Sequence, residues 1–333
     1  DGNLFIKDAI KNGSKIIISD KIKINNFKNN ILFLNVKNPR NLLAQFSSKI
    51  FNKKPKNLIA VTGTNGKSSI ANFYFQILNL SKIKVASIGT LGVDGIKIRN
   101  KVSNTTFDTI QINKILKKLK KKKIENVILE SSSHGLNQNR LDGLKFDIGI
   151  FTNLSRDPLD YHRSYKNYLN SKLILFKKLL KKKSYAIFDD DLKISSNLNR
   201  ITKSNKIEKF TIGNNKSSFT ILEHQFLKDE QNIIFRFDKK EYSFSTKLIG
   251  RVQIKNLLMA IMAAIKSKIP LEKILKITQK IKPVNGRLEK IGRLYNNGII
   301  ILDYAHTPDA LKTCIKNVKE QFKLRKINLV FGC

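Results

Sequence analysis

The stretch of this chain whose spacing points most clearly to chemistry is Gly-Thr-Asn-Gly-Lys-Ser at residues 63–68. It lies between an apolar, β-branched run at 58–62 and a helical pattern. In such a turn, backbone amides and a helix N-terminus can hold phosphates, while Lys67 neutralises their charge and Ser68 reaches Mg²⁺. The spacing departs from GxxxxGK[ST], because Val61 stands where the first glycine is expected. The alternative is a glycine turn with an exposed lysine, and the flanking strand and helix favour the phosphate loop.

A second polar cluster follows the apolar run at residues 126–130. Glu130 ends that run, so we expect its carboxylate at the carboxyl edge of a sheet, where a metal-holding carboxylate beside a phosphate loop belongs. Ser-Ser-Ser-His-Gly-Leu at 131–136 comes next, and Gln138 and Arg140 follow. This density of polar groups suits an anionic substrate. A Ser-rich loop without a ligand is the alternative that the residues alone leave open.

These stretches need elements that position them, and the apolar pattern predicts a parallel α/β arrangement. Short β-branched runs with turn residues nearby predict buried strands at 15–19, 58–62, 126–130, 146–152 and 299–303. One helical face is predicted from apolar residues spaced by three and four, at Ile70, Phe73, Tyr74, Ile77 and Leu78. Strands alternating with helices indicate parallel sheets. Residues 217–246 alternate instead and could form an antiparallel flap, and 328–333 resembles a strand followed by nothing.

Composition bounds the class of protein. With 333 residues and 41% apolar residues, the chain is long enough for two or three globular domains. Its longest nearly uncharged apolar run, 257–265, is far shorter than the roughly 20 residues of a membrane helix. Cys314 and Cys333 are its only cysteines and cannot form a disulfide framework, which favours a reducing compartment. We therefore expect a soluble, cytoplasmic protein.

The formal charge of +39 would by itself suggest a nucleic acid or an anionic membrane as partner. Basic residues are spread along the whole chain, however, and lysine greatly outnumbers arginine. The lysine runs at 117–123 and 177–183 sit on or just after amphipathic helical patterns, so we interpret them as the solvated side or end of a helix. The composition favours neither a nucleic-acid nor a membrane partner.

Beyond these separate signals, the motifs of the chain resemble those of a known family, the Mur ligases, and most closely the MurE type. That type adds meso-diaminopimelate or L-lysine to a UDP-muramoyl dipeptide. The motifs occur in the family's order, at residues 61–68, 104–106, 130–140, 151–157, 168–176, 286–289 and 303–311. The resemblance covers nearly the whole chain and is weak only at 189–248. It also implies that the chain is truncated at both ends.

The resemblance implies an α/β protein with three parts. Residues 1–53 would be a partial N-terminal α/β domain that binds UDP. Residues 54–285 would be the central ATP-binding domain, built on a P-loop-type parallel sheet. Residues 286–333 would begin a C-terminal, Rossmann-like domain that binds the amino acid. The first boundary falls near 53–56, just before the first strong strand, and the second near 283–286, where Pro and Gly interrupt the helical periodicity.

The implied activity is ATP-dependent amide ligation in peptidoglycan synthesis, adding the third amino acid to UDP-MurNAc-L-Ala-D-Glu through an acyl phosphate, with ATP and Mg²⁺. The implied ATP-binding residues are Gly63, Thr64, Asn65, Gly66, Lys67, Ser68, Ser69, Asn256, Arg287 and Asp303. The implied substrate-binding residues are Asn104, Thr105, Thr106, Ser132, Gln138 and Arg140. Catalysis would fall to Lys67, Glu130 and Lys172, and the metal to Ser68, Glu130 and a carbamylated Lys172. Spacing alone would make Lys172 a solvated helix residue.

One departure from the family bears on metal binding. The chain has Arg156-Asp157-Pro158 where the family usually has Arg-Asp-His, so a histidine that commonly assists the second metal is absent. Two other functions remain as alternatives: a sister ligase on the same scaffold, such as folylpolyglutamate synthase or another Mur ligase, and a basic nucleic-acid-binding P-loop protein. We expect the protein to act as a monomer on small-molecule substrates.

Overall fold

The computed structural model describes residues 2–96, 104–155, 161–227 and 230–332, and a ten-stranded sheet dominates it. The strand order is β13-β12-β11-β10-β9-β8-β4-β7-β5-β6. Its parallel centre consists of β4 (Asn57–Thr62), β5 (Val85–Gly89), β7 (Asn126–Glu130), β8 (Phe146–Phe151), β9 (Leu180–Asp189) and β10 (Glu208–Gly213). The predicted α/β class with a parallel central sheet is confirmed.

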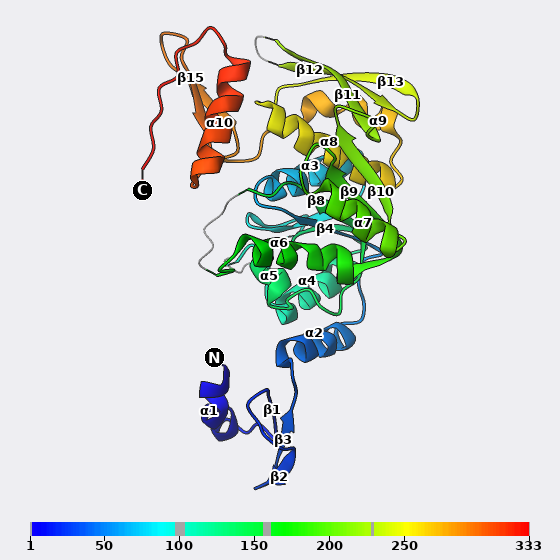
Figure 1. Cartoon of the computed structure of the whole chain (residues 1–333), viewed down its shortest axis with the longest axis vertical. Coiled ribbons are helices and arrows are strands. Elements are labelled where there is room, and N and C mark those ends of the chain that lie inside the picture. Colours follow the sequence, from blue (N-terminus) through cyan, green and yellow to red (C-terminus); the bar gives the residue numbers. More distant parts are fainter. Residues whose placement is uncertain (1, 97–103, 156–160, 228–229, 333) are drawn as a thin grey trace.

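The central strands are largely buried because helices cover both faces of the sheet (Figure 1). On β4, Leu58 and Ala60 belong to one buried cluster and Ile59 and Val61 to the other, as the two-residue repeat of a strand requires. The first cluster includes residues of α4 (Thr109–Lys121), α6 (Tyr165–Ile174) and α7 (Ser195–Ser204). The second includes residues of α3 (Lys67–Leu80), α8 (Arg251–Lys266) and α9 (Leu271–Leu275).

The topology brings three strand ends together. Strand β4 lies between β7 and β8, with Val61 opposite Glu130 and Thr62 opposite Phe151. Because these strands are parallel, the loops that follow them leave from the same edge of the sheet. The phosphate-loop sequence follows β4, and the Ser-rich sequence with α5 (Ser133–Asn137) follows β7.

Both edges of the main sheet turn antiparallel. Strand β6 (Gly92–Asp94) pairs with β5 at one edge. At the other edge lie β11 (Phe219–Phe226), β12 (Gln231–Phe237) and β13 (Lys240–Thr246), with β11 parallel to β10. The antiparallel segment predicted for 217–246 is therefore present, as a continuation of the main sheet.

Smaller units lie at the two ends of the molecule's long axis (Figure 1). The N-terminal unit has a 3-10 helix (Gly2–Phe5), α1 (Ile6–Lys11) and a sheet of β1 (Ile16–Ser19), β2 (Asn26–Lys28) and β3 (Ile31–Asn35), joined to the main sheet through α2 (Pro39–Ile50). The C-terminal unit has β14 (Glu289–Arg293), β15 (Ile299–Leu302) and α10 (Pro308–Gln321). A π-helix (Leu175–Leu179) follows α6, and a 3-10 helix (Thr278–Lys280) follows α9.

Some local predictions were wrong. The strand predicted at 299–303 exists as β15, but it pairs only with β14 and leaves Ile300 38% and Leu302 48% exposed, because no helix layer covers it on both faces. Residues 328–331 form no strand, since none of the described strands runs beside them to complete a ladder. Within the second lysine run, residues 181–183 lie on β9 rather than on a helix.

Within the described residues, no helix is long and apolar enough to cross a membrane.

Candidate nucleotide and metal site

The loop between β4 and α3 has the backbone of a phosphate-binding turn. Gly63 and Gly66 have φ values of +144° and +87°, which side chains rarely tolerate. A Cβ on Gly66 would also lie 2.6 Å from Asn256 Oδ1. Gly66 caps α3 without a side chain, so no side chain of the cap residue occupies the helix N-terminus. The backbone N–H groups at the N-terminus of α3 are therefore suited to binding an anion.

Two lysines converge on this loop. Lys67 Nζ donates to the carbonyl oxygens of Gly63 (3.0 Å) and Thr64 (2.7 Å). Lys172 Nζ, from α6, donates to the same Gly63 oxygen at 2.8 Å and lies 4.2 Å from the centre of the Tyr168 ring. Lys172 is only 2% exposed. The solvated helix lysine that spacing alone predicted is thus wrong, because α6 packs its lysine-bearing side against the phosphate loop.

Glu130 lies on the other side of the loop, at the end of β7. It is 3% exposed, and its Oε2 accepts a hydrogen bond from Ser68 Oγ at 3.0 Å. Thr90 donates to both carboxylate oxygens, through its backbone N–H (3.0 Å) and its hydroxyl (3.1 Å). Gly89 makes room for this, since a Cβ there would collide with Glu130. Sequence reasoning missed Thr90, although it directly follows a buried strand, β5, at the same edge of the sheet.

The predicted substrate-binding residues form a hydrogen-bonded cluster beside Glu130. Thr106 is 1% exposed, and its Oγ1 lies 2.9 Å from Glu130 O and 3.0 Å from Ser132 Oγ. Arg140 donates to Thr106 O at 2.6 Å and to Gln138 Oε1 at 2.8 Å.

The two predicted substrate residues that precede Thr106 lie nearer the solvent. Thr105 Oγ1 lies 3.1 Å from Thr90 Oγ1 and lines the cavity described below, whereas Asn104 is exposed. The structure therefore joins Thr105, Thr106, Ser132, Gln138 and Arg140 into one network that also includes Glu130.

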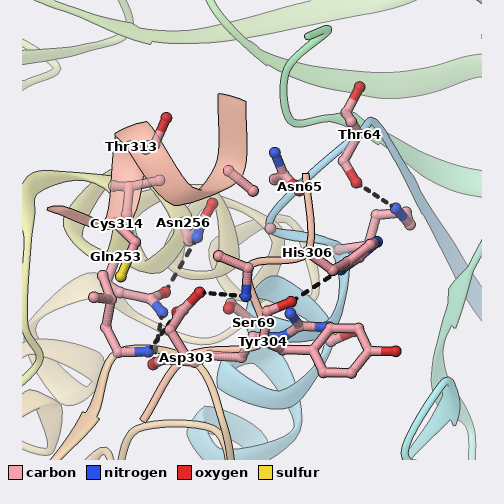
Figure 2. A pocket seen from close by; sticks show the side chains of 18 of the residues that line it. Thr64, Asn65, Ser69, Gln253, Asn256, Asp303, Tyr304, His306, Thr313 and Cys314 are labelled. Atoms are coloured by element: carbon pink, nitrogen blue, oxygen red, sulfur yellow. Dashed lines mark hydrogen bonds between the residues drawn. The ribbon is translucent and has the colours of Figure 1, made fainter. Parts of the chain in front are cut away.

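A cavity of about 330 Å³ opens over the phosphate loop. One wall is the loop itself, with Lys67, Ser68, Ser69, Thr90 and Glu130. The facing wall comes from α8 and the C-terminal unit, with Gln253, Asn256, Arg287, Asp303, Tyr304, His306, Thr313 and Cys314. Figure 2 shows Asn256 hydrogen-bonded to Gln253, on the same side of the cavity as Thr313 and Cys314 of α10. Nine of the ten residues predicted to bind ATP line this cavity, and Gly63 is the tenth.

The facing wall is held by polar contacts. Asp303 accepts hydrogen bonds from the backbone N–H groups of Leu288 (2.8 Å) and Ala305 (2.9 Å). Burial raises the pKa of Asp303, while those hydrogen bonds and the charge of Arg287 oppose the rise. The Arg287 guanidinium lies 4.6 Å from the centre of the Tyr304 ring, a cation–π contact.

The oxygen donors at the loop fit a hard cation. A hydroxyl (Ser68) and a buried carboxylate (Glu130) meet at one point, and Mg²⁺ prefers one or two such ligands together with phosphate oxygens. The described residues contain no cluster of three or more His, Cys, Asp or Glu side chains that could hold a metal by themselves. An unmodified Lys172 would not bind a cation, whereas a carbamate on its Nζ would add a carboxylate-like ligand beside Gly63.

The departure at Arg156-Asp157-Pro158 lies outside the described residues. His162, a few residues further on, is described: it is 4% exposed, and its Nδ1 lies 3.3 Å from the hydroxyl of Ser171, the residue before Lys172.

Comparison with known families agrees with this architecture. A model of the Mur ligase middle domain matches residues 61–264, and a model of the Mur ligase, glutamate ligase domain matches residues 286–333. The chain belongs to the Mur ligase family. Within it, the chain is 39% identical to the UDP-N-acetylmuramoyl-L-alanyl-D-glutamate–2,6-diaminopimelate ligase of Rickettsia bellii, and 33% identical to the ligase of the same name from Chelativorans sp.. These matches cover all of this chain and 69% and 68% of the two relatives.

Solved structures give the same picture. A structure of a ligase of that name matches 95% of the chain with a TM-score of 0.79 and 26% identity, and the chain spans 64% of its length. MurF ligase from Thermotoga maritima in complex with ADP matches with a TM-score of 0.65 and 16% identity. The match covers 95% of this chain and 68% of the MurF chain, which shows a shared fold. An FPGS complex with AMPPCP and folate has the same fold, with a TM-score of 0.66 and 15% identity over 86% of this chain and 76% of its own. The nucleic-acid-binding alternative finds no support in these matches.

Proposed function

We propose that this chain carries the ATP site and the acceptor site of a ligase that joins 2,6-diaminopimelate to UDP-N-acetylmuramoyl-L-alanyl-D-glutamate. The observation that supports this most is the convergence of Lys67, Lys172 and Glu130 around one phosphate loop that faces a cavity. The names of the relatives that match the whole chain support the choice of substrates. The sister-ligase alternative rests on fold alone, at 15–16% identity.

Each wall of the cavity has a role in this proposal. The backbone amides of the phosphate loop and Lys67 bind the ATP phosphates, while Asn256, Arg287 and Asp303 complete the nucleotide site from the facing wall. Thr106, Ser132, Gln138 and Arg140, with Asn104 and Thr105, hold the UDP-linked dipeptide. A cationic guanidinium and hydroxyls suit its carboxylates and phosphates.

Ser68 and Glu130, with Lys172 as a carbamate, would hold Mg²⁺, which when bound neutralises charge on the phosphates. Carbamylation of Lys172 requires only CO₂: its neutral amine attacks the carbon of CO₂, an N–C bond forms, and one proton leaves. The product carries a negative charge where the ammonium was positive. Thr90 then acts by orienting the Glu130 carboxylate through two hydrogen bonds.

The reaction is an acyl activation followed by amide formation. An oxygen of the D-glutamate carboxylate attacks the γ-phosphorus of ATP, the bond to the β-phosphate oxygen breaks, and ADP leaves. The amine of the incoming amino acid then attacks the acyl carbon, inorganic phosphate leaves, and the amine loses a proton. The chain contributes mainly by positioning and by electrostatic stabilisation, as is general for phosphoryl transfer. We place this reaction in cytoplasmic peptidoglycan synthesis, carried out by a monomer.

The test is ligation by the protein in its full length, with ATP, Mg²⁺ and UDP-MurNAc-L-Ala-D-Glu, and with meso-diaminopimelate or L-lysine as acceptor. We expect one ADP for each amide formed, with meso-diaminopimelate preferred, and no turnover when Mg²⁺ is omitted. Mass spectrometry of the product identifies the added residue. Turnover with a folate and glutamate instead, or none with either amino acid, would refute the proposal.

A further inference from the structure

Helix α8 begins without a cap from its own segment. Its N-cap residue is Gly250, which has no side chain, so the first amides of the helix need partners from elsewhere. Those partners come from α10. Asn317 Oδ1 accepts from the N–H of Val252 at 3.0 Å, and Gln321 Oε1 accepts from the N–H of Gly250 at 2.8 Å. The residues involved are 65 and 71 positions apart in sequence.

The contact is close and buried. Asn317 and Gln321 are 6% and 8% exposed, although most of α10 is not buried. Gly250 has a φ of +85°, and a Cβ on it would lie 2.7 Å from the Cβ of Asn317, so only glycine admits the helix at this distance. An ion pair between Arg251 and Glu320, at 3.3 Å, flanks the two amides.

One face of α10 serves both the cavity and this contact. Ala310, Thr313 and Cys314 line the nucleotide cavity, and Asn317 and Gln321 continue the same face at spacings of three, four and seven. Asn317 is also oriented by its own helix, because its Nδ2 donates to Thr313 O at 2.8 Å.

The first turn of α8 also contacts residues that line the cavity. One residue after Val252, Gln253 donates to the carbonyl oxygen of Arg287 at 3.1 Å. One turn on, Asn256 donates to Gln253 Oε1 at 3.1 Å and packs against the backbone of Gly66. The first turn of α8 is therefore the place where the C-terminal unit, the phosphate loop and the cavity meet.

We propose that Asn317 and Gln321 are positioning residues that dock the C-terminal unit by capping α8 in trans, and so hold Arg287, Asp303 and α10 over the nucleotide. The rest of α8 does not depend on them, since the residues from Leu257 to Ala264 are at most 2% exposed in the main core. Removing the side-chain amides of Asn317 and Gln321 should release the C-terminal unit without unfolding the main sheet. The inference deepens the proposed function, because it assigns the closing of the ATP site to this contact.

The test uses the double variant Asn317→Ala/Gln321→Ala, with Lys319→Ala on the exposed side of α10 as the matched control. Deuterium uptake in residues 250–254 reports the capped amides directly, and calorimetry with the ATP analogue AMPPCP and Mg²⁺ reports the cavity. We expect exchange roughly tenfold faster and nucleotide affinity roughly tenfold weaker in the double variant, the effect of leaving a buried donor unpaired. The single variant Asn317→Asp keeps an acceptor at a helix N-terminus and should leave both values close to those of the parent chain.

A merely structural role would instead lower the melting temperature of the main unit in the double variant. Exchange equal to that of Lys319→Ala refutes the docking contact. Faster exchange with unchanged nucleotide affinity also refutes the proposal, because the contact would then not position the cavity. If the parent chain binds no nucleotide but the double variant still loosens α8, the proposed function fails while the capping contact stands.

Discussion

The two walls of the cavity over the phosphate loop are supported by different parts of the structure. The wall with Lys67, Ser68 and Glu130 lies at the ends of strands in the centre of a ten-stranded sheet, which has buried clusters on both faces. The wall with Arg287 and Asp303 lies beside a two-stranded sheet in which large apolar side chains are half exposed. One wall is held by the hydrophobic core, whereas the other is held by a few buried hydrogen bonds.

This difference separates two tasks. Close-packed cores hold their side chains rigidly, so the phosphate loop and Glu130 are positioned before any ligand arrives. Polar interfaces between units of one chain permit relative motion. Under our proposal, the facing wall is the part that opens to admit a nucleotide, and the contact of α10 with α8 is the part that closes it.

The largest expected effect lies in the core-backed wall. Lys67→Ala should weaken binding of Mg-AMPPCP by about 100-fold or more, because a cation that contacts phosphate in a low-dielectric site is lost. Calorimetric titration measures it, and Lys84→Ala, an exposed lysine ahead of β5, is the control. Equal affinity in the two variants would mean that this wall does not bind phosphates.

A pair of glycine substitutions compares the walls directly. Gly66 and Gly286 both have positive φ, of +87° and +67°, but a Cβ meets Asn256 only at Gly66 and meets nothing within 4 Å at Gly286. Gly286→Ala should therefore cost only the backbone strain, about 1–2 kcal/mol. Gly66→Ala should cost more and also weaken nucleotide binding several-fold. Denaturant unfolding of both variants measures the difference, and equal losses would show that the two walls are equally tightly packed.

The smallest effect probes whether the facing wall stays closed. Burial, with the nearby charge of Asp303, raises the pKa of the Cys314 thiol to about 11. At pH 8.5 the thiolate fraction should then be roughly 100-fold below that of an ordinary cysteine, and it should rise as the pH approaches 11. Alkylation by iodoacetamide, followed by mass spectrometry of the Cys314 peptide, measures this against a short cysteine peptide. A rate equal to that of the peptide would show that the wall is open in solution.

Much of the central architecture could be predicted from local patterns. The strand at residues 126–130 has the predicted bounds, and the predicted helical face from Ile70 to Leu78 is buried on α3. The motif series also led to the right family. By contrast, β15 was predicted to be buried because its residues are apolar, but apolar composition does not say whether a covering layer exists.

The sequence by itself determined the strand–loop–helix that forms the phosphate loop, since glycine positions, apolar runs and helix starts are properties of neighbouring residues. Only the tertiary structure decided that Lys172 donates to the carbonyl oxygen of Gly63, 109 residues away. The same holds for the hydrogen bond from Thr90 to Glu130 and for the capping of α8 by α10. Such contacts depend on the order and register of strands and on which helix faces meet. Those follow from the packing of the whole chain, which no local pattern contains.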